Sequence, residues 1–352
     1  MEIKDLPSHE VVEQAIHKAE SCQDKPLVVV QCCTYNQGRY ITQCLEGFVM
    51  QKTTFSFIAL VHDDASTDDT AEIVRDYANC YPNIIVPILD PVNRYSMPGS
   101  LNFVVGEVTR AYAPKYIALC EGDDYWTDPL KLQKQVDFLE EHQDYAICFH
   151  NVKVLDDNTG EIKKDWITRD VQETTDINRL AIDNYIHTLS VVYRNISLTD
   201  EEKNLIYNIF PGDYPRHLIM AQYGQIFKIS DAMGVYRCSS GIWSSKNSEY
   251  RISLTLDMLR RLIDFFIPND SVVNILKKTY SRLTSELYVI LETQNCNERI
   301  FERMRVDFRY SNKIFLIRHL GKIEFHHFQQ TCVFKAFIML LRPLHRLKKM
   351  IK

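Results

Sequence analysis

The sequence lacks the features that mark several common classes of protein. Only 11 glycines and 12 prolines occur among 352 residues, which excludes collagen-like, low-complexity and disordered chains. No run reaches the roughly 18 apolar residues of a membrane span. The N-terminus lacks a basic segment followed by an apolar one, so we expect no secretory signal and a cytoplasmic protein. A net charge of -5 argues against a charge-driven nucleic-acid-binding protein.

Cysteine pairs and glycine-rich nucleotide loops are also missing. The 10 cysteines are scattered and form no Cys-x-x-Cys pair. Several stand inside apolar runs, where cysteine behaves as a small buried hydrophobic residue, so we expect reduced thiols. Neither GxGxxG nor GxxxxGK[ST] occurs. A dinucleotide-binding dehydrogenase and a P-loop nucleotide-binding protein are therefore excluded.

From residue 26 onward, short apolar runs alternate with amphipathic helical patterns. This alternation predicts an α/β fold with a mostly parallel sheet flanked by helices. Residues 27–33 form a continuous apolar run, which is typical of a strand buried on both faces. Beyond about residue 250 the pattern is almost wholly helical. We predict an N-terminal helix (1–25), an α/β domain (26–245), a helical region (246–330) and an amphipathic, basic tail (331–352).

Polar side chains follow three of the predicted strands. They are Tyr35 and Asn36, Asp63 and Asp64, and Asp123 and Asp124. Because ligands of open α/β sheets gather at the carboxyl ends of the strands, we expect these groups to converge. A cluster of oxygen ligands suits Mg²⁺ or Mn²⁺ rather than Zn²⁺ and leaves coordination positions for phosphate oxygens. The sequence therefore predicts a divalent cation and a nucleoside diphosphate.

Each acidic pair also has a structural alternative. Ser66 or Thr67 is predicted to cap a helix with Asp68 and Asp69 in its first turn, so the Asp63–Asp64 pair could serve helix capping instead. The pair at 123 and 124 could form a solvated turn, although Tyr125 and Trp126 beside it suggest a lined cleft. The segment 156–160 has the composition of a hairpin turn.

Three segments resemble, in order and spacing, the motifs of the family 2 glycosyltransferases, which use nucleotide sugars and have the GT-A fold. The segments are Val28–Asn36, His62–Thr70 and Glu121–Trp126, and the resemblance extends over about residues 26–245. It implies that Asp64 contacts the uracil of a UDP-sugar and that Tyr35 packs near the base, with Cys33 and Asn36 in the same donor-binding loop. It also implies that Asp124 binds Mn²⁺ or Mg²⁺ and that Asp123 lies near the ribose or the sugar.

Later segments resemble the acceptor half of longer bacterial members of that family. Asp183–Arg194, which contains His187, resembles a strand along the acceptor cleft, and Trp126 and Trp243 are candidates for stacking on sugar rings. Phe210–Pro215 resembles the segment that carries the catalytic base, which implies this role for Asp213. Its alternative is a turn or capping residue. In that segment Tyr214 replaces the commoner Trp.

Two short segments, Tyr236–Arg237 and residues 241–244, resemble the closing motif of that family, which reaches back toward the diphosphate. Arg237 is therefore a candidate donor-binding residue, because a guanidinium suits bidentate phosphate contacts. Its alternative is a surface ion pair. Cys238 stands where that family often has His, so we assign it no phosphate contact.

The resemblance implies a metal-dependent, inverting, hexosyltransferase-type enzyme. It would transfer a sugar from a nucleotide-sugar donor, UDP-linked, to a hydroxyl of a glycan or lipid-linked acceptor in surface polysaccharide synthesis. Two alternatives stay open. One is a sugar nucleotidyltransferase, whose usual glycine-rich phosphate loop is missing after the first strand. The other is a catalytically inactive nucleotide-sugar-binding module, which would more often have lost Asp124 or Asp213.

The C-terminal tail combines an apolar patch with a basic end. Residues 342–352 contain five Lys or Arg and no acid, and Val333–Leu341 is largely apolar. This combination predicts peripheral contact with anionic headgroups at the inner face of the cytoplasmic membrane. The alternative is a helix packed on the body of the protein with a solvated basic end.

Overall fold

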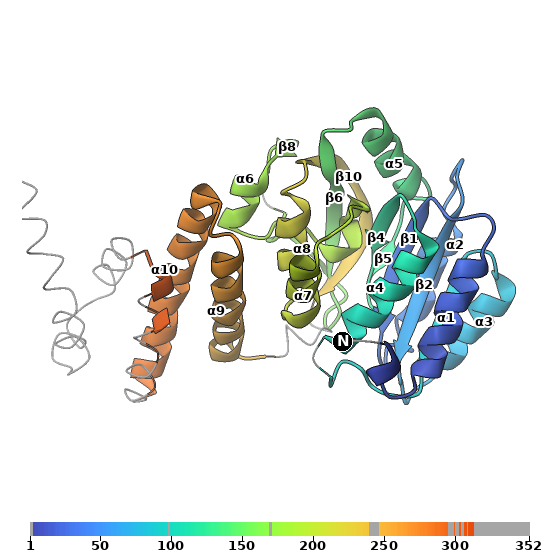
Figure 1. Cartoon of the computed structure of the whole chain (residues 1–352), viewed down its shortest axis with the longest axis horizontal. Coiled ribbons are helices and arrows are strands. Elements are labelled where there is room, and N and C mark those ends of the chain that lie inside the picture. The colour runs from blue at the N-terminus through green and yellow to red at the C-terminus, as the bar shows by residue number, and fades with distance from the viewer. Residues whose placement is uncertain are drawn as a thin grey trace, which may run out of the picture. The chain divides into compact units, whose positions relative to one another are not determined.

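The computed structural model divides the chain into two compact units, Met1–Ser245 and Lys246–Lys352 (Figure 1). It describes residues 3–97, 99–168, 171–238 and 246–294 and, beyond these, residues 299, 303, 306, 307 and 309–312. The closing-motif residues 241–244 and the tail at 331–352 lie outside the described residues.

One ten-stranded sheet forms the centre of the first unit. Its strands are β1 (Val28–Thr34), β2 (Phe57–Asp64), β3 (Ile85–Asp90), β4 (Tyr116–Leu119), β5 (Tyr125–Trp126), β6 (Tyr145–Asp156), β7 (Ile162–Lys163), β8 (Thr174–Thr175), β9 (Val192–Arg194) and β10 (Gln225–Cys238). The order is β3-β2-β1-β4-β9-β6-β10-β5, and β7 and β8 pair with β6 and β10. The pairs among β1 to β4 and the pair β6–β10 are parallel, and the antiparallel β9 joins these two groups. This arrangement confirms the predicted mostly parallel α/β fold.

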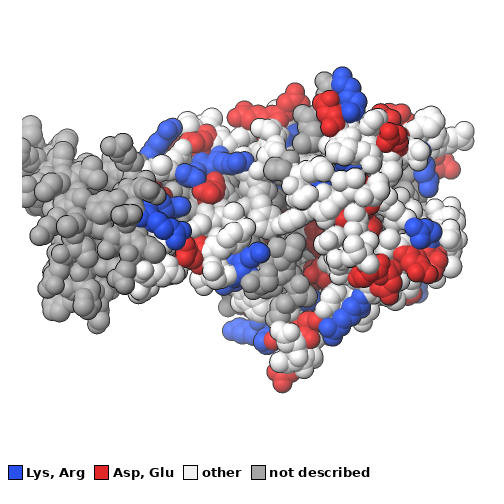
Figure 2. Space-filling model, turned by 90° about the horizontal axis from the view of Figure 1, so that it is seen from below, with Lys and Arg blue, Asp and Glu red and all other residues white. Residues whose placement is uncertain are grey.

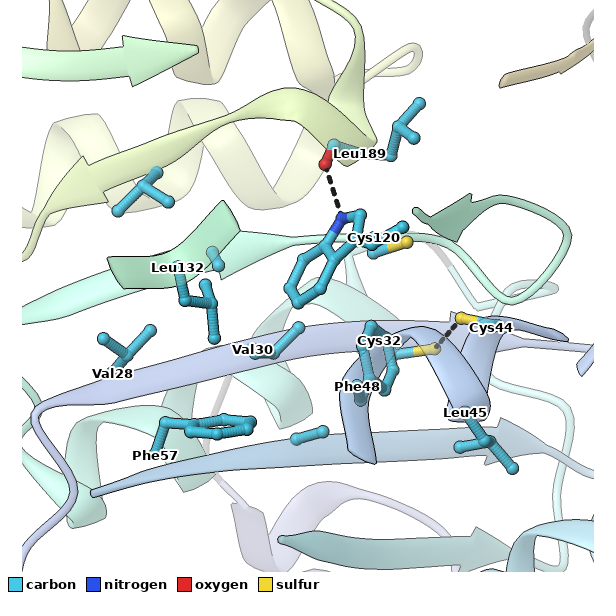
Figure 3. Packing of buried hydrophobic residues seen from close by; sticks show 14 of the residues in the cluster. Val28, Val30, Cys32, Cys44, Leu45, Phe48, Phe57, Cys120, Leu132 and Leu189 are labelled. Atoms are coloured by element: carbon cyan, nitrogen blue, oxygen red, sulfur yellow. Dashed lines mark hydrogen bonds between the residues drawn. The ribbon is translucent and has the colours of Figure 1, made fainter. Parts of the chain in front are cut away.

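Helices pack on the two faces of this sheet (Figure 1). They are η1 (Ile3–Asp5), α1 (His9–Ser21), α2 (Ile41–Val49), α3 (Thr70–Cys80), α4 (Ser100–Tyr112), α5 (Lys131–Glu141), α6 (Ile177–Ile182), η2 (Thr188–Ser190), α7 (Asp200–Asn208) and α8 (Asp213–Met220). Because side chains alternate along a strand, β1 contributes to two separate cores. Val30 and Cys32 pack with Phe48 of α2 (Figure 3). Val29, on the other face, packs with Val104 of α4. The continuous apolar run is thus buried on both faces, as predicted.

The described cysteines are all free thiols, as the sequence predicts. Cys32 and Cys44 are buried, and their Sγ atoms lie 3.9 Å apart (Figure 3). Burial raises the pKa of the Cys44 thiol well above its ordinary value. The thiol therefore stays protonated and acts as a packed apolar group.

Two local predictions are wrong. Helix α3 begins at Thr70, because the Ser66 hydroxyl donates to Asp63 and the Thr67 amide donates to Asn36, so that residues 66–69 form a turn. The segment 183–194 forms a strand only at Val192–Arg194, since η2 interrupts it. The turn predicted at 156–160 is present, and there the Gly160 amide donates to the Asp156 carbonyl at 2.8 Å.

The second unit contains two long helices in its described part, α9 (Ser248–Phe265) and α10 (Asp270–Thr293). Asn247 caps α9 by accepting a hydrogen bond from the Tyr250 amide. The Tyr280 and Tyr288 hydroxyls both donate to the buried Asp307. Among the helices that the structure describes, none is long and apolar enough to span a membrane.

Candidate active site

A cavity of about 540 Å³ opens at the carboxyl ends of β1, β2 and β4. Three carboxylates from separate parts of the chain line it: Asp64 at the end of β2, Glu121 after β4 and Asp213 at the start of α8. Figure 2 looks onto this end of the sheet and shows acidic atoms inside a hollow of the first unit. Of the polar groups predicted to converge at the strand ends, Tyr35 and Asp64 line this cavity, whereas Asn36, Asp63, Asp123 and Asp124 do not.

Asp64 is held in place by backbone amides. One carboxylate oxygen accepts from the Arg94 amide at 2.6 Å and the other from the Tyr95 amide at 2.9 Å. Tyr35, which is 43% exposed, and Cys33 line the same cavity. Burial raises the pKa of the Cys33 thiol well above its ordinary value. The structure thus brings Asp64, Tyr35 and Cys33 together.

A buried charged network supports the segment that holds Asp64. The Arg94 Nε donates to the Asp90 carboxylate, and His62 Nε2 lies 3.3 Å from the same carboxylate oxygen. Arg94 Nη2 also donates to the Pro7 carbonyl at 3.0 Å. Burial alone would raise the pKa of Asp90, but the hydrogen bonds from His62 and Arg94 lower it. The carboxylate therefore stays ionised and fixes Arg94.

Asn36 joins two loops rather than lining the cavity. It has a φ of 50°, a conformation that asparagine tolerates better than most residues. Its side-chain oxygen accepts from the Thr67 amide at 2.8 Å, and its own amide donates to the Ser66 hydroxyl at 2.8 Å. Asn36 therefore connects the loop after β1 to the loop after β2.

The acidic segment after β4 packs tightly against the loop after β1. A Cβ on Gly122 would lie 2.4 Å from Gln37 Oε1 and 2.8 Å from Thr34 Cβ, so this position requires glycine. Glu121 reaches solvent within the cavity, yet the surrounding protein, and secondly Asp123, raise its pKa to about 7. Asp124 is buried, and its Oδ1 accepts from the Arg237 amide at 2.8 Å.

The adjacent carboxylates have the chemistry of a cation site but do not form a complete one. Burial, and then repulsion from Asp123, raise the pKa of Asp124 well above its ordinary value. A divalent cation would relieve that repulsion, and oxygen donors suit Mg²⁺ or Mn²⁺. In the part of the chain that the structure describes, no group of three or more His, Cys, Asp or Glu residues could hold a metal ion. The remaining ligands would be oxygens of a substrate or of water.

Arg237 does not line the cavity. It is 8% exposed, and Tyr40 and Tyr125 face its guanidinium with ring centroids at 4.9 and 5.1 Å. Its Nη1 donates to Asp157 at 3.2 Å and its Nη2 donates to Gln43. Since this side chain is buried and paired, its placement favours a structural role over the predicted phosphate contact.

Asp213 is the first residue of α8 and lines the cavity. Asn184 Nδ2 donates to its Oδ2 at 3.2 Å. Burial raises the pKa of Asp213, while hydrogen bonds and the charge of Arg216 act in the opposite direction. A carboxylate with a raised pKa accepts a proton more readily, which suits a general base.

The predicted acceptor-cleft residues lie elsewhere. Trp126 is 2% exposed, and its Nε1–H donates to the Leu189 carbonyl at 2.8 Å, so it belongs to the core. His187 is also buried, and its Nε2 lies 3.0 Å from Asp165 Oδ1. Neither lines the cavity, and a large ring with one satisfied polar atom is stable in a core. Trp243 lies outside the described residues.

Several cavity residues received no role from the sequence. They are Glu121, Arg94, Tyr95, Phe210 and Arg216. Tyr95 and Phe210 are exposed and pack edge to face with centroids 6.0 Å apart. Phe210 and Arg216 lie within a few residues of Asp213 in the sequence, and this proximity could have indicated that they line the same cavity. Tyr95 carries no such signal, because its place depends on the fold of the loop after β3.

Comparisons with known proteins agree with this architecture. Residues 30–200 match the family described as Glycosyl transferase family 2. An uncharacterised protein of Mycobacterium tuberculosis is 38% identical over 219 residues, which are 62% of this chain and 61% of that protein. The match thus spans about three fifths of that relative's length. A relative from Bacillus subtilis with glycosyltransferase in its name is 33% identical over 38% of this chain and 45% of its own.

Among solved structures, residues 1–349 of S. aureus TarS in complex with UDP-GlcNAc superpose with a TM-score of 0.52. The sequence identity is 18%, and the superposition covers 71% of this chain and 70% of that one. At this identity the likeness concerns the fold, and it confirms the GT-A fold predicted from the sequence.

Proposed function

Because this chain belongs to glycosyl transferase family 2, with its family domain at residues 30–200, we propose that it transfers a sugar from a nucleotide-sugar donor to a hydroxyl group. The observation that carries this proposal is the meeting of Asp64 and Asp213 in one cavity, although 149 positions separate them in the sequence (213 minus 64). One end of such a cavity suits a nucleoside and the other suits a reacting hydroxyl.

Asp64 and Tyr35 would bind the base of the donor. Both oxygens of Asp64 already accept from backbone amides, so the carboxylate has a fixed orientation. A fixed carboxylate can accept from the N3–H of uracil, and the exposed Tyr35 ring offers a surface for stacking. A UDP-linked donor is therefore the first candidate, and TarS, which shares the fold, binds UDP-GlcNAc.

Asp123 and Asp124 would hold Mn²⁺ or Mg²⁺ together with oxygens of the diphosphate. When bound, the cation offsets charge that develops on the departing nucleoside diphosphate. Burial, and then repulsion from Asp123, raise the pKa of Asp124, and this crowding of two carboxylates supports the assignment. Arg237 would act indirectly, because its backbone amide orients Asp124 while its side chain pairs with Asp157.

Asp213 would be the catalytic base of an inverting transfer. A single displacement needs a base near the attacking hydroxyl, on the face of the sugar opposite the leaving group. Asn184 holds one carboxylate oxygen of Asp213, and burial raises its pKa. The acceptor would be a glycan or a lipid-linked sugar, with a role in surface polysaccharide synthesis at the membrane. The basic composition of residues 342–352 supports this location.

A ligand-stabilisation experiment tests the donor assignment. The unfolding midpoint of the full chain is measured with and without UDP, each with and without Mn²⁺, for the wild type and Asp124→Ala. A ligand at about 100 times its dissociation constant adds about 2.7 kcal/mol. We expect stabilisation by UDP that requires Mn²⁺ and disappears in Asp124→Ala. A shift with another nucleotide but not with UDP would change the donor, and no shift with any nucleotide would refute the proposal.

A further inference from the structure

Arg216 of α8 is a cationic group in the cavity to which neither the family motifs nor the proposed mechanism gives a role. It lies three positions after Asp213, close to one helical turn, and lines the cavity together with Asp213 and Glu121. It also lines an adjoining cavity of about 340 Å³. Arg216 as a whole is half-buried. It therefore lies where two open spaces of the first unit meet.

A chain of hydrogen bonds fixes the position of Arg216. Its Nη1 donates to Gln31 Oε1 at 2.9 Å, Gln31 Nε2 donates to Thr109 Oγ1 at 2.8 Å, and the Thr109 hydroxyl donates to the Val105 carbonyl at 2.7 Å. The Thr109 hydroxyl has one proton, which it donates to the Val105 carbonyl. The Thr109 oxygen must therefore accept from the side-chain amide of Gln31. The Gln31 carbonyl oxygen consequently faces Arg216, and two buried side chains hold the guanidinium in the cavity.

Among the described residues, no carboxylate pairs directly with the charge of Arg216. Within the described residues it forms no salt bridge, although Asp213 and Glu121 are near enough for its charge to oppose the rise of their pKa values. A guanidinium has five N–H donors, and the bond to Gln31 uses one. The other donors form a planar fork suited to phosphate or carboxylate oxygens. An arginine held in this way suits an anionic ligand.

The depth of Arg216 in the cavity limits which part of a donor it can reach. Gln31 precedes the end of β1 at Thr34 by three residues, about 10 Å along the strand at about 3.3 Å per residue. Asp64 and Tyr35, in contrast, lie where the strands end. Resting on the function proposed above, we propose that Arg216 binds an anionic oxygen group of the nucleotide sugar beyond its base. The group is either a phosphate of the diphosphate or a carboxylate on the transferred sugar.

Calorimetric titration of the full chain tests this proposal with four probes in the presence of Mn²⁺: UDP, UDP-glucose, UDP-glucuronic acid and inorganic pyrophosphate. The variants are Arg216→Gln and, as a control with the same change of charge, Arg110→Gln. Arg110 lines the adjoining cavity, pairs with Glu107 and does not line the main cavity. If Arg216 binds phosphate, Arg216→Gln weakens UDP and pyrophosphate at least about tenfold. If it binds a sugar carboxylate, UDP affinity is unchanged and a preference for UDP-glucuronic acid over UDP-glucose is lost.

Other outcomes separate this proposal from the proposed function. Affinities within twofold of the wild type for all four probes overturn the role of Arg216, as does an equal loss in Arg110→Gln. Pyrophosphate binding that depends on Arg216 without any UDP binding keeps the role and rejects a UDP donor. A wild type that binds none of the probes overturns both. If Arg216→Gln does not fold, Arg216→Lys keeps the charge but loses the fork, and we expect at least threefold weaker binding.

Discussion

Replacing Asp90 with Asn should strongly destabilise the first unit, because the change leaves the Arg94 charge buried without its carboxylate. Both side chains have 0% exposure in their salt bridge. Removing one partner of a buried ion pair costs about 3–5 kcal/mol. For 150–250 residues, 1 kcal/mol corresponds to about 2–4 °C in Tm, so we expect the midpoint to fall by roughly 6–20 °C.

Thermal unfolding of the full chain, followed by circular dichroism at pH 7, measures this effect. The matched control is the double variant Asp90→Asn, Arg94→Met, which removes the stranded charge and should recover part of the lost stability. The pKa of Asp90 in the folded protein lies below its unfolded value of about 3.9. The contribution of Asp90 to the free energy of unfolding is therefore present above about pH 3.9 and is lost as the pH falls through the folded pKa. A Tm of the Asp90→Asn variant within about 2 °C of the wild-type Tm at pH 7 would refute this reasoning.

Three further changes test other parts of the molecule. Asp213→Asn should lower kcat by about 10²–10⁴ while leaving UDP affinity within twofold, and unchanged turnover of a UDP-sugar would exclude a base role. Trp126→Phe removes the donor to the Leu189 carbonyl and should cost about 1–3 kcal/mol in denaturant unfolding without raising the KM for acceptor. A raised KM for the acceptor at unchanged stability would instead indicate that Trp126 lines the acceptor cleft. Deletion of residues 342–352 should weaken sedimentation with anionic vesicles but not UDP binding, and unaltered sedimentation at low salt would reject the membrane role.

The strand core and one end of the cavity could be predicted from the sequence because their signals are local. The continuous apolar run at 27–33 requires burial on both faces, and β1 packs into two cores. Asp64 directly follows the buried residues of β2, so parallel pairing alone brings it to the edge where Tyr35 lies. In both cases the order of residues along a strand determines the three-dimensional position.

The roles of Trp126 and His187 depended on contacts that the sequence does not display. In the two-residue strand β5, Tyr125 is half-buried and Trp126 is buried, and a strand this short leaves no alternating pattern from which to predict the inward side. His187 pairs with Asp165, 22 positions earlier in a segment without a motif. A polar residue near acidic motifs therefore indicates a cleft only when its long-range partners are known.

The same limit applies to Arg237, which the sequence predicts to contact phosphate, and to Arg216, which the structure places in the cavity. Arg237 lies in a recognisable motif, yet Asp157 already balances its charge, whereas Arg216 lies outside any motif and has no salt bridge among the described residues. Among the described residues that line the cavity, Asp64, Asp213 and Glu121, whose pKa is about 7, face the guanidinium of Arg216, while Asp90 already balances the charge of the other lining arginine, Arg94. The negative charge of these carboxylates repels a diphosphate unless a further positive charge enters the cavity together with it. We therefore expect donor binding to require a divalent cation for electrostatic reasons, independently of any motif.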